Sequence, residues 1–350
     1  MRTFRHRIKL AIWAAAALIV SPCANSGDGF IQPIFGGNPY VVVPTPFSPQ
    51  SSRHGTDLSV GADGGIYITA TGSSVEAGGD QDGAVVRLNP DGALDTTFGT
   101  DGSYRLPAID GSVTGAQTAH ATLGLPDTSV ALAGSTTTQL GLEKWSFLHL
   151  NSAGQLLDRW DGPSAFRTFF HTVSFHESSS GRMLATTGGE VFPFTDDSNF
   201  LAGRFDISAG SFDPELNGGN TSQIAIDISG MPELDRLSQT FSLADGSTLL
   251  FGFSQNHVPF KTDPVIVKLK VNGTLDTSFA TGGIWNHAGV YFGGGMDRYD
   301  EATGAMDVDD EGRYVVVTTA SDGVLPPDRI VFRRILPDGT TDLPGGFTVY

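Results

Sequence analysis

The stretch MDRYDEATGAMDVDDEG holds the densest group of side chains that could do chemistry. Within it, Asp307, Asp309 and Glu311 alternate before a glycine, a spacing that calcium loops use to bring oxygen ligands to one side. The bidentate acid that such a loop needs eleven residues after Asp307 is absent, because Thr318 stands there. The same residues also suit a tight turn between two strands. Two interpretations therefore stay open, a weak calcium site and a hairpin turn, and no other cofactor is expected.

A second polar stretch, HTVSFHE, invites a zinc interpretation. His171 and His176 are five residues apart, so on a strand they point to opposite faces and cannot bind one ion together. His171 and Glu177 share a face but would lie roughly 20 Å apart. The spacing does not fit a zinc motif. The sequence also has no phosphate-binding loop, nucleophile elbow or paired-histidine metal helix.

The elements that must position these residues repeat along the chain. A basic residue followed by an apolar one precedes a turn at intervals of about sixty residues. The five copies are Arg87-Leu88, His149-Leu150, Arg204-Phe205, Lys268-Leu269 and Arg334-Ile335. Short apolar runs bounded by turn residues surround each copy, which is typical of β-strands. The sequence predicts an all-β chain with repeats at about 53–107, 117–165, 169–222, 236–286 and 302–350.

Each repeat has room for four consecutive antiparallel strands. A sheet of four such strands has two apolar faces and cannot bury both alone, whereas sheets packed face to face around an axis bury them all. Residues 27–350 are therefore expected to form a single β-propeller, with five blades of four antiparallel strands. A β-sandwich or an open solenoid is the competing architecture, although neither needs a four-stranded unit of this length.

One copy of the repeat carries a family resemblance. The sequence RLNPDGALDTTFG, from Arg87 to Gly99, resembles the signature of the delta-60 repeat family of bacterial exported β-propeller-type proteins. The copy from Lys268 to Phe279 is similarly close, and the other three have drifted. The resemblance implies the fold and export, and it brings no agreed chemistry with it.

The residues that repeat suit structural roles. Asn89-Pro90-Asp91-Gly92 is a β-turn sequence that joins strands. A carboxylate that follows the turn once per blade is expected to hold a backbone corner rather than to act as an acid. These carboxylates are Asp95, Asp158, Asp213, Asp276 and Asp342. Phe98, Trp160 and Phe279 are expected to be aromatic wedges between neighbouring blades.

Two segments compete to close the ring. The sequence FGGNPYVVVP at residues 35–44 resembles the stretch FGTDGSYRLP that begins at Phe98, so it is expected to be a lone fourth strand that completes the last blade. The C-terminal stretch from Phe347 to Tyr350 could supply that strand as well. The sequence leaves both possibilities open.

Propeller sites usually lie where the inner strands begin, around the mouth of the central channel. Aligning the copies on the turn at Asp63-Gly64 brings a mixed set of acids, bases and imidazoles to that mouth. The candidate ligand-binding residues are His54, Asp57, His120, His171, Arg236, Asp300 and Glu301. Such a set suits a polar ligand. Two of the carboxylates could also act as acid and base in glycoside chemistry if they faced each other at about 5–9.5 Å.

Charge and the N-terminal segment limit the partners. The chain has 21 basic and 38 acidic residues, a net charge of −17, and nucleic acid and anionic lipid are poor partners for so acidic a surface. A basic start and the apolar run from Leu10 to Val20 are typical of a secretory signal, and the run is too short to span a bilayer. We expect a signal peptide over residues 1–26 and an exported chain. Lipid attachment at Cys23, the lone cysteine, is the alternative.

Taken together, these patterns predict an exported, non-enzymatic propeller that binds a protein or glycan partner through its rim loops and channel mouth. No nucleic-acid partner and no membrane span are expected. The alternative function is that of a hydrolase or lyase that acts on a polysaccharide at the same mouth.

Overall fold

The structure is a computed structural model. It describes residues 53–73, 81–107, 117–137, 143–161, 166–179, 182–191, 199–213, 216, 223–228, 235–256, 261–286, 300–321, 329–342 and 347–349. The expected signal peptide, Cys23 and the closing strand at 35–44 lie outside these residues. Within them, no helix has the length and apolar character needed to cross a membrane.

The described strands form four antiparallel sheets, three of which have four strands in sequence order. Unit 1 contains β1 (Arg53–Val60), β2 (Ile66–Ser73), β3 (Gln81–Leu88) and β4 (Ser103–Arg105). Unit 4 contains β14 (Asp235–Ser242), β15 (Thr248–Asn256), β16 (Lys261–Leu269) and β17 (Ile284–Asn286). Unit 5 contains β18 (Asp300–Val308), β19 (Tyr314–Ser321), β20 (Arg329–Ile335) and β21 (Phe347–Val349).

The remaining sheet has nine strands and contains two repeats. Unit 2 is formed by β5 (Gln117–Gly124), β6 (Val130–Thr137), β7 (Glu143–Leu150) and β8 (Leu156–Asp161). Unit 3 is formed by β9 (Phe166–Ser179), β10 (Arg182–Val191), β11 (Asn199–Asp206), β12 (Ser211–Phe212) and β13 (Gln223–Ile226). A single pairing of Glu143 with Phe166 joins β7 to β9. Separate blades were expected here; the junction merges their hydrogen-bond ladders.

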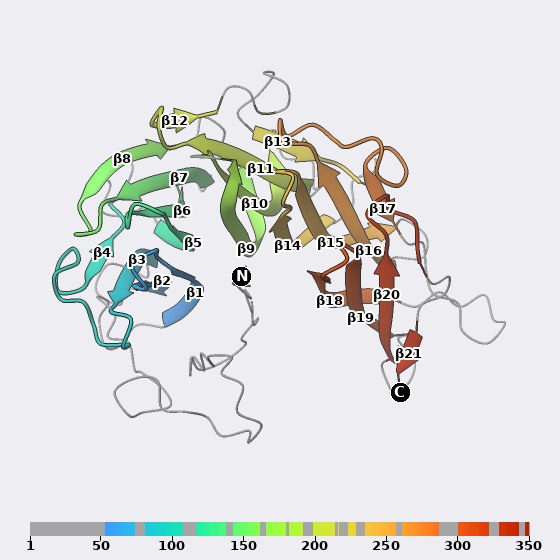
Figure 1. The fold of residues 1–350 in the computed structure, drawn as a ribbon, viewed down its shortest axis with the longest axis horizontal. Helices are drawn as coiled ribbons and strands as arrows, with labels where there is room; N and C mark the ends of the chain where they lie inside the picture. Colours follow the sequence, from blue (N-terminus) through green and yellow to red (C-terminus); the bar gives the residue numbers. More distant parts are fainter. Residues whose placement is uncertain are drawn as a thin grey trace.

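Figure 1 shows the units arranged as an arc around a centre. The first strand of each unit, β1, β5, β9, β14 or β18, lies nearest the centre, and the fourth strands lie outside. The arc is open between unit 5 and unit 1 in this view (Figure 1). The fold is an all-β propeller; the number of blades in a closed ring stays a prediction.

The core lies between the units rather than within one. Separate apolar clusters join unit 1 to unit 2, unit 2 to unit 3, unit 3 to unit 4 and unit 4 to unit 5. As expected for wedges, Phe98 and Phe279 are almost fully buried in two of these clusters. Trp160 differs, because it lies within β8 and is only partly buried against its cluster.

Tight turns of the expected kind join the third and fourth strands. The Gly92 amide donates to the Asn89 carbonyl at 2.9 Å, and the Gly339 amide donates to the Leu336 carbonyl at 2.8 Å. Both glycines have positive φ, 83° and 86°, which a residue with a Cβ rarely adopts. The turn prediction is confirmed at both places.

Candidate functional site

The inner strands carry all seven candidate ligand-binding residues. His54 and Asp57 are on β1, His120 is on β5 and Arg236 is on β14. His171 is on β9, and Asp300 and Glu301 begin β18; the structure describes the backbone but not the side chains of these three. His54 and Arg236 are exposed. The structure thus brings the candidates to one strand layer, but no contact among their side chains is described.

Asp57 and His120 have internal contacts. The Asp57 carboxylate accepts a hydrogen bond from the Thr122 amide of β5 at 3.1 Å, which links the inner strands of units 1 and 2. In the corresponding place between units 4 and 5, the Gln239 side-chain oxygen accepts from the Met306 amide at 2.6 Å. His120 is buried, and its Nε2 lies 2.8 Å from the Ser135 hydroxyl. Both residues therefore help to hold the inner strands together.

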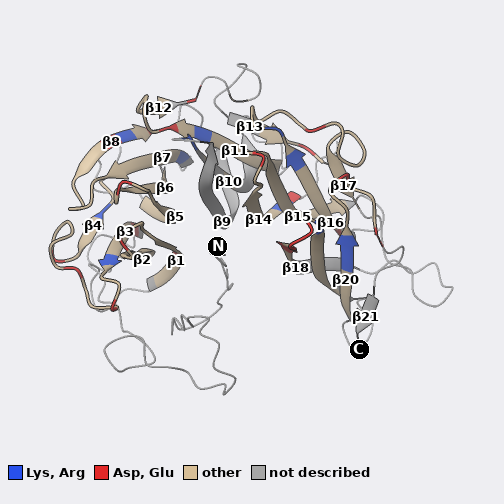
Figure 2. Cartoon of the chain, viewed as in Figure 1, with Lys and Arg blue, Asp and Glu red and all other residues tan. Residues whose placement is uncertain are grey.

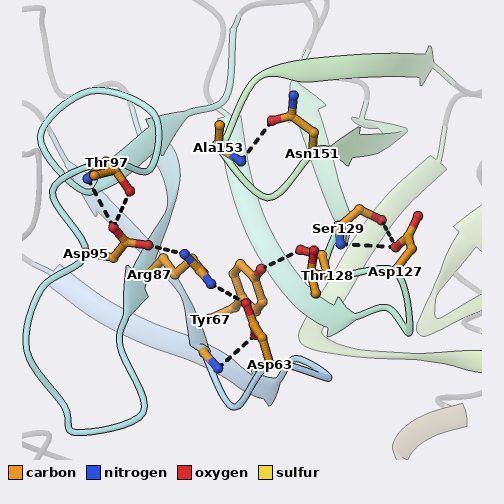
Figure 3. Close-up of polar contacts among 11 residues, drawn as sticks. Asp63, Tyr67, Arg87, Asp95, Thr97, Asp127, Thr128, Ser129, Asn151 and Ala153 are labelled. Carbon is orange, nitrogen blue, oxygen red and sulfur yellow. Dashed lines mark hydrogen bonds and ion pairs between the residues drawn. The ribbon is translucent and has the colours of Figure 1, made fainter.

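The opposite ends of the strands carry a polar network that the sequence did not reveal (Figure 3). Arg87, at the end of β3, lies between the carboxylates of Asp95 and Asp63, with Nη2 2.5 Å from the Asp63 Oδ2. Its guanidinium lies over the Tyr67 ring, 5.6 Å from the centroid. The Tyr67 hydroxyl then donates to the Thr128 carbonyl of unit 2 at 3.0 Å. The network thus fixes a corner of unit 1 against its neighbour.

The basic residue and the aspartate of each repeat pair with one another. Arg204 Nε lies 2.6 Å from the Asp213 Oδ2, and Lys268 Nζ lies 3.5 Å from the Asp276 Oδ2. The pairs in units 1 and 5 are Arg87 with Asp95 and Arg334 with Asp342. In unit 2 the contact is loose, with His149 Nδ1 3.8 Å from Asp158. Basic strand ends beside acidic turns are visible in Figure 2.

These carboxylates are held ionised. A hydrogen bond from the Ser278 hydroxyl is the main cause that lowers the pKa of Asp276; burial opposes it, and the Ser278 amide and the Lys268 charge add to it. Burial raises the pKa of Asp95, but hydrogen bonds from Thr97 and the Arg87 charge outweigh it, so the pKa is lowered. A general acid in glycoside hydrolysis needs a raised pKa. The repeated aspartates are therefore structural, as the sequence indicated.

The calcium candidates lie at a hairpin turn. The Gly312 amide donates to the Asp309 carbonyl at 2.9 Å, so the turn interpretation is confirmed. Asp309 also pairs with Arg313 Nε at 2.7 Å, and Glu311 pairs with Arg313 Nη1 at 2.5 Å. Asp307 accepts a hydrogen bond from the amide of the next residue. In the described part of the chain, no three acids, histidines or cysteines are grouped to hold a metal ion. Calcium binding here stays a prediction.

One buried polar row was missed by sequence reasoning. Asp235 of β14 pairs with Ser254 of β15, which pairs with Asp263 of β16, so the three side chains share one face of unit 4. All three residues have 0% exposure. Asp235 accepts a hydrogen bond from the Ile228 amide at 2.9 Å, and the Ser254 hydroxyl has no partner among the described residues. The alternation of Asp263 with Val265 was the available signal.

Comparison with known proteins gives a partial family match. A family model described as "Domain of unknown function (DUF5122) beta-propeller" matches residues 61–98 and 259–279. These two ranges contain the two repeat copies with the sharpest signature, and they support a β-propeller family. No curated protein matches the sequence.

Solved structures with a similar chain trace have very different sequences. A Bacillus subtilis levansucrase in complex with oligosaccharides is 8% identical, with 87% of this chain and 89% of that chain covered and a TM-score of 0.41. The polysaccharide lyase Uly1 is 10% identical, with coverages of 90% and 64% and a TM-score of 0.41. The Hadza microbial sialidase Hz136 is 11% identical, with coverages of 78% and 51% and a TM-score of 0.42.

Proposed function

We propose that this protein is an exported β-propeller that binds a protein or glycan partner through the face at which the inner strands begin. One observation carries the proposal: the two ends of the units differ. The ends that carry the β1–β2 and β3–β4 turns repeat the same short turns and the same carboxylate pairs. The connections from β2 to β3 and from unit to unit leave from the other end and share no sequence. Repetition indicates a structural role, so recognition is assigned to the variable end.

Two described side chains at the variable end are suitable contacts. His54 is the second residue of β1, and Arg236 is the second residue of β14; both are exposed. An imidazole and a guanidinium donate hydrogen bonds to hydroxyl, carbonyl or carboxylate oxygens. Such contacts suit a neutral or acidic glycan and suit a peptide backbone equally. The lowered pKa values of the aspartates at the turn end give no reason to place chemistry there.

A glycan array and a pull-down from the natural surroundings would test the binding proposal. His54→Ala and Arg236→Ala should each weaken binding of the captured partner about tenfold, as expected for the loss of one or two hydrogen bonds to a charged or polar group. Asp310→Asn is the matched control, because Asp310 is exposed at the β18–β19 turn at the other end. Binding that survives both substitutions but is lost in the control would refute the assignment of the face.

The second candidate is a hydrolase or lyase that acts on a polysaccharide. The observation that favours it is the pair Asp235 and Asp263, which lie on one face of unit 4 with one strand between them, about 10 Å apart at the backbone. Their side chains could approach the separation that glycoside chemistry uses, about 5–9.5 Å. Their complete burial is the observation against it, because a polymer must reach both acids.

Product release from a panel of polysaccharides would test this candidate. If the acids react, Asp235→Asn and Asp263→Asn should each abolish release, whereas Asp227→Asn, at an exposed position nearby in the sequence, should not. Release that persists in both variants would exclude these acids. The assignment to the delta-60 repeat family is the finer part of the proposal; its support is the match of a β-propeller family model to the same two repeat copies.

A further inference from the structure

The interfaces between units use a wedge and a recurring hydrogen bond. Between units 1 and 2, Phe98 lies in a cluster with Val130, Leu132, Leu148 and Leu150, and the next amide, Gly99, donates to the Ala153 carbonyl at 2.8 Å. Between units 4 and 5, Phe279 packs edge-on against Tyr314, with ring centroids 5.9 Å apart. The next amide, Ala280, donates to the Asp338 carbonyl at 2.7 Å. Each wedge thus comes from one unit and packs against the following one.

Unit 1 has the same receiving surface as unit 2. Val130 pairs with Leu150 and Leu132 pairs with Leu148 in unit 2, and Ile66 pairs with Leu88 and Ile68 pairs with Val86 at the corresponding places of unit 1. The unit 1 residues form an apolar cluster with no aromatic member, which we call the wedge seat: Ile66, Ile68, Val86 and Leu88. Val86 and Leu88 are 1% and 3% exposed. No described strand of unit 5 is in substantial contact with unit 1, so the cover has another origin.

Unit 5 lacks a wedge of its own. Phe98 and Phe279 stand three residues after Asp95 and Asp276, but the residue three places after Asp342 is a glycine. The missing cover is visible on β20, where Phe332 is 36% exposed. Its counterpart in unit 1, Val85, is fully buried in the cluster that contains Phe98.

We propose that Phe35 of the N-terminal segment fills the wedge seat between unit 5 and unit 1, with the Gly36 amide donating to the Asp91 carbonyl. The sequence FGGNPYVVVP matches the stretch that begins at Phe98, and Asp91 holds the turn position that Ala153 and Asp338 hold in units 2 and 5. The fourth-strand position on β20 is occupied by β21, through Phe332 with Phe347. The N-terminal segment therefore supplies the wedge and leaves the strand to the C-terminus.

Thermal unfolding and hydrogen exchange of the full chain would test the proposal. Phe35→Ala should lower Tm by about 5 °C or more, as expected when a buried ring is lost from a domain of this size, and Phe98→Ala should do at least as much. Phe30→Ala is the matched control, with an expected shift below about 1 °C. Amides from Gly36 to Val43 should exchange slowly in the unsubstituted protein, a readout that does not depend on the variants folding.

Two results would overturn the proposal. One is a Tm of Phe35→Ala equal to that of Phe30→Ala, together with fast exchange of residues 36–43. The other is a dimer in solution, measured by light scattering, whose dissociation exposes the wedge seat while Phe35→Ala leaves it unchanged. In that case a second copy of the chain, and not the N-terminal segment, covers the seat.

Discussion

Arg204 and Asp213 form a buried ion pair, with side chains 2% and 1% exposed. Arg105 and Asp82 make a similar contact at the surface, where the arginine is 54% exposed. Removing one partner of a buried pair leaves an uncompensated charge, whereas an exposed charge returns to water. Arg204→Met should therefore lower the free energy of unfolding by about 3–5 kcal/mol. Arg105→Met should cost about 0–1 kcal/mol in the same urea titration, and equal losses would contradict the distinction.

The aspartates at the turns also set the dependence of stability on pH. The pKa of Asp276 is lowered in the folded state, chiefly by the Ser278 hydroxyl. A lowered pKa contributes stability above the ordinary aspartate value of about 3.9, and this contribution is lost as pH falls below that value and through the folded-state pKa. The Tm of Asp276→Asn should thus fall less than that of the unsubstituted protein between about pH 5 and pH 3. Asp310→Asn, at an exposed position, is the control; parallel curves for all three proteins would contradict the assignment.

At the residue scale, the sequence predicted the role of the repeated aspartates but not their partners. The signal was present, because the basic anchor and the aspartate are eight residues apart in Arg87 and Asp95 and nine apart in Arg204 and Asp213. The sequence could not reveal the row of Asp235, Ser254 and Asp263, since it depends on the register of three strands. Pairing across strands is fixed by the turns and the core and leaves no local pattern.

At the scale of elements, the corner after β3 places strict limits on one glycine. Gly99 has a φ of 57°, and a Cβ there would lie 2.1 Å from the Ser103 carbonyl oxygen. Gly282 has a similar φ of 65°, but a Cβ at that position would have no neighbouring atom within 4 Å. Gly99→Ala should cost about 3 kcal/mol or more, because strain and a clash add, and Gly282→Ala about 1 kcal/mol from strain alone. Similar losses in chemical denaturation would show that the corner yields easily.

The repeat anchors allowed most elements to be predicted. All five basic residues lie at or near the end of a third strand, in β3, β7, β11, β16 and β20. The inner strands are irregular where the sequence showed nothing, with register shifts between Gly55 and Asp57 and between Leu237 and Gln239. The junction of β7 with β9 was equally silent, because a single backbone pairing requires no particular side chain.

For the whole molecule, the acidic charge makes a prediction about partners. With 38 acidic and 21 basic residues, the surface repels phosphate backbones, and the described basic side chains at the strand ends are paired with carboxylates. We expect no retardation of duplex or single-stranded DNA in a gel at about 150 mM salt, since affinity for nucleic acid depends on free basic groups. Retardation that weakens as salt rises would show a basic surface that the net charge conceals.

The links between inner strands bear on how the protein behaves in a crowded solution. Each inner strand is an edge strand, whose unpaired amides and carbonyls could recruit a strand from another molecule. Side chains of the neighbouring unit occupy some of these groups: Asp57 accepts from Thr122, Ser59 accepts from the Gly124 amide at 3.0 Å, and Gln239 accepts from Met306. The same bonds that join the blades therefore protect their edges against aggregation by strand addition.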